Sequence, residues 1–416
     1  MTEVIEQIKV KEIEQGKEKR NVPELRFRGF EDEWTKYCFF DCVTIRNGQV
    51  SPLERPYCDM PHIGPGNIEK YTGRLLDYNT AKEDKQISGK YLFDEYDIIY
   101  GKINPQLGKV VFPQFKGLCS ADTYPLKVNR NIMVSYFLFM YLQTQRFSKY
   151  TISVSMRSGM PKINREELGE FQFKVPSLQE QKKIADFFTL IDRKIEKQSE
   201  KVEALKTYKK GIMQKIFKQE IRFKDENGRE YPEWEDKRLG DIIELKSVRN
   251  SNNNVNFILS VSNSKGFICQ DEQFEDRIVA SSNVSNYKVV NKDDFAFNPS
   301  RINVGSIARL KYFEQGIVSP MYICFRCKSR LKNDFLEFFL DTYHFNAQVK
   351  NKLEGSVRQS LSSDSLCSIK INLPCLKEQV KIANFLTIIN KKIEKEEKKL
   401  EKLKVYKKGL LQKMFV

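Results

Sequence analysis

Two short polar segments carry side chains that could read the edges of DNA bases. The first holds Lys102, Asn104 and Gln106, and the second holds Arg301 and Asn303. Lysine and arginine donate hydrogen bonds to guanine, whereas asparagine and glutamine pair with adenine. Lys102-Ile-Asn and Arg301-Ile-Asn stand 199 positions apart, so the same arrangement occurs twice. Asparagine, glycine and serine also mark turns for backbone reasons, so the repetition counts for more than any single residue.

A second pair of polar segments repeats in the same way. Ser155-Met-Arg157 corresponds to Ser356-Val-Arg358, which is followed by Gln359. The predicted DNA-contacting side chains are therefore Lys102, Asn104, Gln106, Arg157, Asn298, Arg301, Asn303, Arg358 and Gln359.

The signatures of catalytic and nucleotide-binding sites are missing. No glycine is followed at the required spacing by the Gly-Lys-Ser/Thr of a phosphate-binding loop. Asn104-Pro-Gln and Asn298-Pro-Ser resemble part of the Asn-Pro-Pro-aromatic motif of adenine methyltransferases, but both lack the second proline and the aromatic residue. We therefore predict no catalytic residue and no cofactor in this chain.

The cysteines and histidines predict no metal site. Cys324 and Cys327 form one Cys-x-x-Cys, but no second pair completes a zinc set among the 9 cysteines. His62 and His344 are the only histidines, and each is expected to be a packing or surface residue.

Charge and composition favour a polyanionic partner and a cytoplasmic protein. The 416 residues carry a formal net charge of +16, as is common when lysine and arginine neutralise phosphates. Much of this charge lies in two helical segments, so it also fits ordinary solvated helix faces. No apolar run approaches the ~20 residues of a membrane span, and the N-terminus shows no signal-peptide pattern.

The chain contains an internal duplication. Residues 175–217 match residues 373–415 without a gap, with 25 identities in 43 positions. Weaker echoes precede each copy, such as Trp34 with Asp41 and Trp234 with Asp241. The sequence therefore consists of two variable domains, each followed by a nearly identical helix.

Both repeated helices carry an apolar seam with the heptad spacing of a coiled coil. Its members are Ile184, Phe188, Ile191, Ile195, Val202 and Leu205 in the first copy and Ile382, Leu386, Ile389, Ile393, Leu400 and Leu403 in the second. Polar residues interrupt the seam at equivalent places, for example at Lys209 and Lys407, which indicates a fixed register. Separate arms for homo-oligomerisation are one interpretation. We favour an antiparallel pair within one chain, with a variable domain at either end.

The predicted fold class is α+β, with two globular domains joined by a long antiparallel two-helix coiled coil in a pseudo-two-fold tandem repeat. Each variable domain is expected to hold short, mostly antiparallel strands and one amphipathic helix, over 134–150 and 335–349. The predicted divisions are a tail (1–21), the first domain (22–175), the first spacer helix (176–218), the second domain (219–373) and the second spacer helix (374–416).

The repeated Pro-x-Leu-x-Glu-Gln-x-x-Ile-Ala-x-Phe pattern closely resembles the specificity subunit of type I restriction–modification systems. It stands here as Pro176, Leu178, Glu180, Gln181, Ile184, Ala185 and Phe187, and again as Pro374, Leu376, Glu378, Gln379, Ile382, Ala383 and Phe385. The resemblance covers the chain from about residue 22 onwards. One departure is that the second copy is followed by Val416 alone, which leaves open how the C-terminal end closes on the first domain.

The resemblance implies a non-catalytic subunit that recognises double-stranded DNA. Each domain would read one half of a bipartite site, and the helices would set the gap. Two modification subunits, which carry S-adenosylmethionine and methylate adenine, would dock on the helices. Restriction subunits that use ATP and Mg²⁺ would join them.

Two other classes of function stay open at this point. A coiled-coil scaffold whose variable domains bind protein partners is the alternative that fits the duplication. A self-sufficient nuclease or methyltransferase is disfavoured by the missing motifs.

Overall fold

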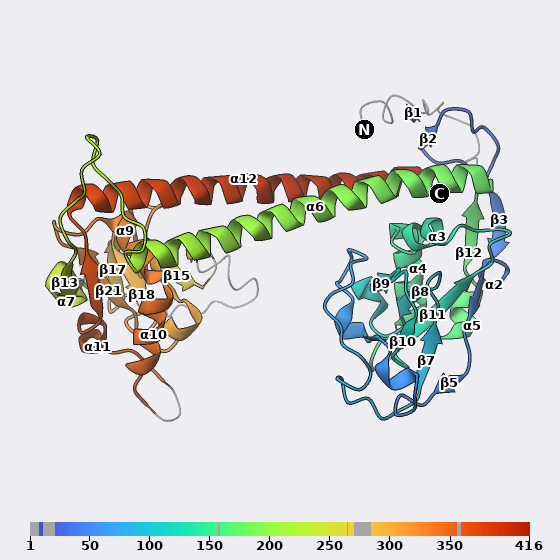
Figure 1. Cartoon of the computed structure of the whole chain (residues 1–416), viewed down its shortest axis with the longest axis horizontal. Helices are drawn as coiled ribbons and strands as arrows, with labels where there is room; N and C mark the ends of the chain where they lie inside the picture. Colours follow the sequence, from blue (N-terminus) through green and yellow to red (C-terminus); the bar gives the residue numbers. More distant parts are fainter. Residues whose placement is uncertain (1–7, 11–20, 157–158, 264, 270–283, 356–358) are drawn as a thin grey trace. The chain divides into compact units, whose positions relative to one another are not determined.

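The computed structural model describes residues 8–10, 21–156, 159–263, 265–269, 284–355 and 359–416 (Figure 1). The chain divides into two compact units. The first unit combines residues 1–199 with residues 398–416, and the second holds residues 200–397. Each unit therefore contains one variable domain together with part of both long helices, whereas the sequence alone suggested separate helical segments.

The first domain is built on two four-stranded sheets with short helices packed against them (Figure 1). One sheet has the order β4 (Val43–Ile45), β11 (Thr123–Val128), β8 (Ile98–Gly101) and β9 (Val110–Val111). The other has the order β5 (Gln49–Val50), β7 (Lys90–Phe93), β10 (Gly117–Cys119) and β6 (His62–Ile63). Two-stranded pairs join β12 (Gln172–Val175) to β3 (Thr35–Cys38), and β1 (Ile8–Val10) to β2 (Leu25–Phe27).

The short helices of the first domain are α2 (Phe39–Cys42), α3 (Ser135–Tyr141), α4 (Gln145–Ser155) and α5 (Arg165–Gly169), with 3-10 turns η1 (Tyr57–Asp59), η2 (Pro65–Asn67) and η3 (Pro105–Leu107). The long α6 (Leu178–Phe217) follows them, and its residues are shared between the two units.

The second domain repeats the central sheet. The order is β14 (Ile243–Lys246), β21 (Ile323–Cys327), β18 (Phe295–Phe297) and β19 (Ile307–Arg309). Three pairs complete it: β17 (Lys288–Asn291) with β20 (Gln315–Val318), β15 (Leu259–Ser262) with β16 (Gly266–Cys269), and β13 (Glu235–Arg238) with β22 (Lys370–Leu373). Its helical elements are α7 (Leu239–Ile242), η4 (Ile302–Val304), α9 (Asn333–Leu340), α10 (Tyr343–Asn351), α11 (Ser363–Cys367) and the long α12 (Leu376–Met414).

The prediction of mostly antiparallel strands is confirmed. Among the named strands of the described residues, β10 with β6 is the parallel pair, and the other pairs are antiparallel. The prediction of one amphipathic helix in each domain is wrong, because α3 and α4, like α9 and α10, are separate. Thr144 and Thr342 cap the second helix of each pair, accepting hydrogen bonds from the backbone nitrogens of Phe147 (3.4 Å) and Phe345 (3.1 Å).

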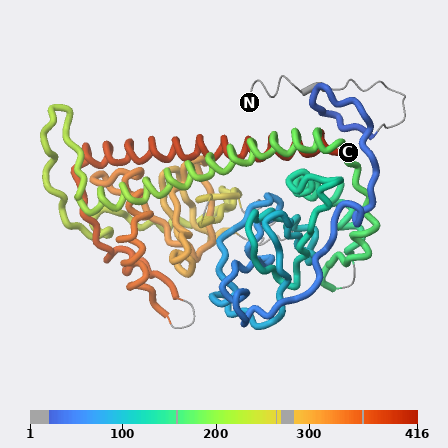
Figure 2. Tube along the Cα trace, turned by 45° about the vertical axis from the view of Figure 1, so that its right-hand side comes forward, coloured from blue at the N-terminus to red at the C-terminus, as the bar shows by residue number. Residues whose placement is uncertain are grey.

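The two long helices, of 40 and 39 residues, begin two positions after Pro176 and Pro374. Within each unit they run side by side in opposite directions (Figures 1 and 2), which confirms the predicted antiparallel pairing inside one chain. Ion pairs join them, Asp192 with Lys407 at 2.7 Å in the first unit and Lys201 with Glu396 at 2.8 Å in the second. Lys407, one of the positions that interrupt the apolar seam, therefore takes part in the register between the helices.

The seam residues are all buried or half-buried. Those near the start of each helix have a second role, because they belong to the cores of the domains. Ile184 and Phe188 lie in the core of the first domain, and Ile382 and Leu386 lie in that of the second. Burial of these apolar side chains fixes each helix to its domain.

Candidate nucleic-acid interface

In the first domain, the loop that carries Lys102 and Asn104 lies next to the segment that follows the predicted Ser155-Met-Arg157. The segment after β8 carries Lys102 and Asn104, and the other segment runs along residues 159–164. The Ile163 nitrogen donates to the Lys102 carbonyl oxygen at 3.0 Å, and the Asn104 nitrogen donates to the Pro161 oxygen at 2.8 Å. Two loops far apart in sequence thus form one polar surface.

The second domain has the same arrangement. The Leu361 nitrogen donates to the Pro299 oxygen at 3.1 Å, so the segment that follows β18 lies beside residues 359–361. Gln359 is exposed there. Arg157 and Arg358, which were predicted from the Ser-x-Arg repeats, lie outside the described residues.

The polar side chains of the first domain are held in defined positions. Asn104 adopts a left-handed conformation (φ 50°) at the start of η3, a region that asparagine tolerates better than most residues. The exposed Gln106 donates from Nε2 to Oδ1 of Asn104 at 3.3 Å. Among the described residues, the side-chain nitrogen of Asn104 meets no hydrogen-bond acceptor, so this donor is available to a further partner.

Cations gather around Lys102. The ammonium of Lys102 lies 5.4 Å from the ring centre of Tyr124, and the guanidinium of Arg165 lies 5.8 Å from the same ring. Burial, followed by the nearby charges of Lys162 and Arg165, lowers the pKa of Lys102. The repulsion between these like charges is relieved when phosphates bind. Sequence reasoning missed Arg165 and Tyr124, because only the fold brings β11 and α5 to this loop.

In the second domain the candidates differ in how free their side chains are. Asn298 is engaged locally, since its Oδ1 accepts from the Ser300 nitrogen at 3.1 Å and its Nδ2 lies 3.7 Å from the sulfur of Met321. Arg301 and Asn303 are exposed on the η4 turn. Arg301 therefore has the greatest reach toward a ligand.

The Glu-Gln pair of the repeated motif joins each domain to its long helix. Arg26 donates to both carboxylate oxygens of the buried Glu180, at 2.8 and 2.7 Å. Arg222 makes the equivalent contacts with Glu378, at 3.4 and 3.0 Å. Bidentate pairs of this kind are among the stronger polar contacts in proteins. Sequence reasoning missed Arg26 and Arg222, because no local pattern links them to Glu180 and Glu378.

The adjacent glutamine fastens the helix that covers each sheet. Gln181 accepts from the Val134 nitrogen (2.9 Å) and donates to the Ile132 oxygen (2.8 Å). Gln379 repeats this at α9, accepting from Lys332 and donating to Arg330. The motif thus positions each domain on its long helix.

The end of α12 closes on the first domain, which answers the question left open by the sequence. Leu410, Leu411 and Met414 belong to the core of the first domain. The main-chain oxygen of Val416 accepts from Tyr141 Oη at 3.2 Å and from Arg146 at 2.5 Å. Figure 2 shows the end of α12 beside the start of α6.

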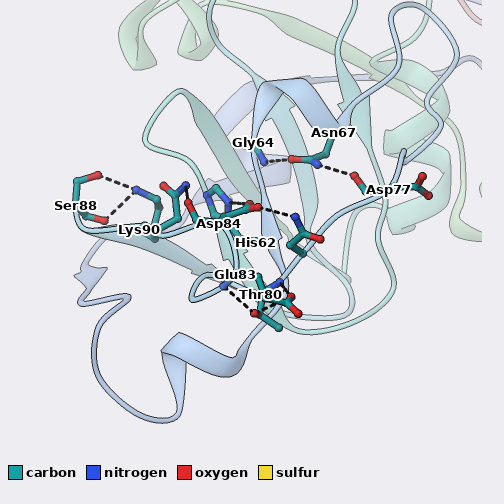
Figure 3. A network of polar contacts seen from close by, with 11 residues as sticks. His62, Gly64, Asn67, Asp77, Thr80, Glu83, Asp84, Ser88 and Lys90 are labelled. Atoms are coloured by element: carbon teal, nitrogen blue, oxygen red, sulfur yellow. Dashed lines mark hydrogen bonds and ion pairs between the residues drawn. The ribbon is translucent and has the colours of Figure 1, made fainter.

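Neither the Cys-x-x-Cys pair nor the two histidines take part in the contacts described above. Burial raises the pKa of Cys324 and of Cys327 to about 12, so both are protonated thiols at neutral pH. No group of three or more metal-ligating side chains occurs among the described residues. His62 is buried, with Nδ1 2.8 Å from the carboxylate of Asp84 (Figure 3), whereas His344 is exposed.

No helix in the described part of the chain is both long and apolar enough to cross a membrane.

Comparison with known proteins gives one consistent family. The model for the "Type I restriction modification DNA specificity domain" matches twice, over residues 31–206 and 231–405. The chain is 34% identical over 195 residues to the type I restriction enzyme EcoDI specificity subunit of Escherichia coli; the match covers 46% of this chain and 43% of that relative. It is 26% identical over 394 residues to a putative type I restriction enzyme MjaX specificity subunit of Methanocaldococcus jannaschii, covering 88% of this chain and 89% of the relative.

Solved structures share the fold. One is the type I restriction–modification system S subunit from M. genitalium, with a TM-score of 0.55 and 16% identity over 95% of this chain and 99% of that one. A chain from a study of complex assembly in the type I R-M system also has a TM-score of 0.55, with 15% identity, covering 92% of this chain and 97% of that chain.

Proposed function

Because this chain belongs to the family of type I restriction–modification DNA specificity subunits, we propose that its two domains each read one half of a bipartite DNA sequence. The chain itself acts as a non-catalytic recognition subunit. Methylation and cleavage are carried out by the proteins that bind it.

The observation that carries this proposal is the recurrence of one polar surface in two divergent domains. Each surface joins the loop after the third strand of the central sheet to a second loop near the end of the domain. Each carries a cation and an asparagine, Lys102 with Asn104 and Arg301 with Asn303. Asn104, Arg301 and Asn303 offer the donors and acceptors that distinguish guanine and adenine in the major groove, and Lys102 offers a positive charge for phosphate.

The paired helices supply the fixed gap between the two half-sites. Their register is held by the ion pairs of Asp192 with Lys407 and of Lys201 with Glu396. Apolar seam residues remove the freedom to slide, because a shift along the helix would expose them.

Two equivalent surfaces of the spacer support the docking of two modification subunits. Leu190 and Tyr406 lie on the exposed part of the helices in the first unit, and Ile388 and Tyr208 lie at the equivalent positions in the second. These four side chains are between 40% and 66% exposed. Exposed apolar residues at duplicated positions fit two copies of one partner. The partner supplies S-adenosylmethionine for adenine methylation, and restriction subunits supply ATP- and Mg²⁺-dependent cleavage.

The test is to co-express the chain with its modification subunit and map methylated adenines across a genome. A two-part motif with a gap of constant length is expected. A contiguous motif, or no sequence preference, would contradict the proposal.

Exchange of residues 22–174 for the first domain of another specificity subunit sharpens this experiment. One half of the motif should change, while the other half and the gap stay the same. The reciprocal exchange of the second domain is the matched control and should change the other half. A change in both halves after a single exchange would refute the assignment of one half-site to each domain.

A further inference from the structure

A β-hairpin of the first domain stands beside the polar surface formed by Lys102 and Asn104. An antiparallel bridge joins Ile68 to Leu75 across the hairpin, and the Leu76 nitrogen donates to the Asn67 oxygen at 2.7 Å. Asn67 anchors its base (Figure 3), since its side chain accepts from the Gly64 nitrogen at 2.9 Å and donates to the Asp77 oxygen at 2.7 Å. The hairpin is therefore a defined element of the domain.

The tip of this hairpin is fixed on two sides. On one side, the Tyr71 nitrogen donates to the Leu107 oxygen of η3 at 3.2 Å. On the other, Gly73 packs so closely that a Cβ there would lie 2.7 Å from the ring of Phe139 and 2.8 Å from Oε1 of Gln143. The tip is thus held against both η3 and the end of α3.

Tyr71 occupies this tip in a strained conformation. Its φ is +63°, in the left-handed region that bulky residues rarely adopt. Its ring lies against Gly108, where a Cβ would come within 3.1 Å of Cδ1 of Tyr71, yet the side chain is 67% exposed. The fold therefore holds a large aromatic side chain in solvent at the cost of backbone strain. Such strain concentrates at functional sites.

Three cations lie on the hairpin or next to it. Lys70 and Arg74 are exposed on the same hairpin, and Lys109 follows the η3 turn and bonds to the carbonyl oxygen of Pro65. Burial and the charge of Lys70 lower the pKa of Lys109. An exposed aromatic ring among cations matches nucleic acid, whose phosphates attract the charges while its base edges offer apolar groups.

We propose that the ring of Tyr71 contacts a base edge in the half-site read by the first domain and determines specificity at that position. This inference rests on the proposed function and adds a reading element to it. The residues Asn104 and Gln106 of η3 lie directly beside the hairpin through the contact of Tyr71 with Leu107 and Gly108, so one base step could meet both elements.

The test uses the complete complex with the modification subunit and duplexes that carry the mapped site. Each base pair of the first half-site is replaced in turn, and competition binding gives the discrimination at each position. The variants are Tyr71→Gly and Tyr71→Phe. Glycine suits the backbone conformation, so Tyr71→Gly should leave the temperature of unfolding unchanged or raise it.

A matched control is Gln114→Gly. Gln114 is also exposed with a positive φ of 64°, but it lies in the turn between β9 and β10. The Gln114→Gly substitution relaxes the backbone of the same domain in the same way, without removing a ring beside η3.

For Tyr71→Gly we expect discrimination at one position of the first half-site to fall roughly tenfold, as on loss of one base-edge contact. The second half-site should be read as before. Tyr71→Phe, which keeps the ring, and Gln114→Gly should both retain native discrimination.

Unchanged discrimination in Tyr71→Gly would overturn the proposal while the proposed function stands. A Phe variant that behaves like the Gly variant would also overturn it, as would an equal loss of affinity for every sequence. If the native complex shows no bipartite motif, the proposed function itself fails.

Discussion

Phe415 stacks on Phe137 in the core of the first unit, with ring centroids 5.1 Å apart and ring planes inclined by 29°. The equivalent contact in the second unit joins Phe217 to Phe335 at 5.4 Å, with an inclination of 37°. Each domain core is therefore completed at the end of a long helix, by Phe217 at the end of α6 and by Phe415 directly after α12. For the second domain this helix directly precedes the domain, and for the first it comes from the far end of the chain.

Phe415→Ala should destabilise the first unit by about 3 kcal/mol, because removal of a buried phenylalanine side chain leaves a cavity among aromatic rings. Hydrogen exchange of the α3 amides is the readout, since it reports the first domain separately. Faster exchange is expected in α3, with α9 unchanged.

The matched variant Phe217→Ala should have the opposite pattern, with faster exchange in α9 and native exchange in α3. Equal effects of either substitution on both domains would mean that the contacts of Phe415 with the first domain and of Phe217 with the second are not independent.

Arg26→Ala should cost about 3 kcal/mol or more, because it leaves the carboxylate of Glu180 buried without its bidentate partner. Arg222→Ala should cost less, because Glu378 keeps a hydrogen bond from Trp234 Nε1 at 3.0 Å. The corresponding Nε1 of Trp34 is buried without a partner in the described structure. Denaturant unfolding of the two variants measures the difference.

The double variant Arg26→Met with Glu180→Gln provides the control. It removes both charges, so much of the lost free energy of unfolding should return. If the double variant is no more stable than Arg26→Ala, the buried carboxylate is not the cause of the loss.

The sequence predicted the parts of the fold that follow from periodicity and repetition. The heptad seam predicted the long helices and their pairing, and the duplication predicted two related domains, but not the four-stranded central sheet that they share. The weak echo of Trp34 and Asp41 proves to be structural. Asp41 accepts from the Cys38 nitrogen at 2.8 Å at the start of α2, and Asp241 accepts from Arg238 at 2.9 Å at the start of α7.

Contacts between distant segments could not be predicted in this way. The sequence contains no local pattern that links Arg26 to Glu180, or Tyr71 to Gly108, since these pairs depend on the path of the chain. The DNA-contacting residues remain predictions for the same reason. Direct readout depends on the docking geometry of side chains that the sequence identifies only by type.

The contact between Phe40 of α2 and Gly169 of α5 also depends on residues far apart in the sequence, and the glycine is on the opposite side of the equivalent contact in the second domain. A Cβ on Gly169 would lie 2.5 Å from Cε2 of Phe40, whereas in the second domain Gly240 packs on Cys367. Gly169→Cys should therefore destabilise the first domain by about 1 kcal/mol, because the half-exposed ring of Phe40 must move. Thermal unfolding of the variant measures this loss.

Adding Phe40→Gly to Gly169→Cys recreates the pair of the second domain. The effects of the two substitutions should then be non-additive in a double-mutant cycle, with the glycine relieving the clash. Additive losses would show that the two positions do not interact.

Protonation of Asp84 should make the first domain less stable in acid. Hydrogen bonds from His62 and then from Asn79 lower the pKa of this carboxyl group. A carboxyl group whose pKa is lowered by folding stabilises the folded state above its unfolded pKa of about 4, and this contribution is lost as the pH falls further. The expected loss therefore begins near pH 4 and grows below it.

Asp84→Asn tests this prediction. At pH 6 the variant should be less stable than the native chain, and the difference should shrink toward pH 3, where the native carboxyl group is also becoming neutral. Exchange of the amides in residues 60–92 is the measurement. A difference that stays constant between pH 6 and pH 3 would exclude ionisation of Asp84 as its origin.

Lys102 and Arg301 should differ in their contribution to DNA binding, although they occupy repeated positions. Lys102 is half-buried over Tyr124 among other cations, which suits a phosphate contact. Arg301 is exposed on η4, with a guanidinium able to form two hydrogen bonds to guanine.

Lys102→Ala should weaken binding to all sequences and reduce the slope of log affinity against log salt by about 1. Arg301→Ala should relax one position of the second half-site by about 1–3 kcal/mol. Binding by the full complex at several salt concentrations, to duplexes altered in either half-site, separates the two effects. If Arg301→Ala changed the salt slope but left base discrimination intact, Arg301 would be a phosphate contact instead, and the reading of the second half-site would have to come from Asn303, Gln359 or their neighbours.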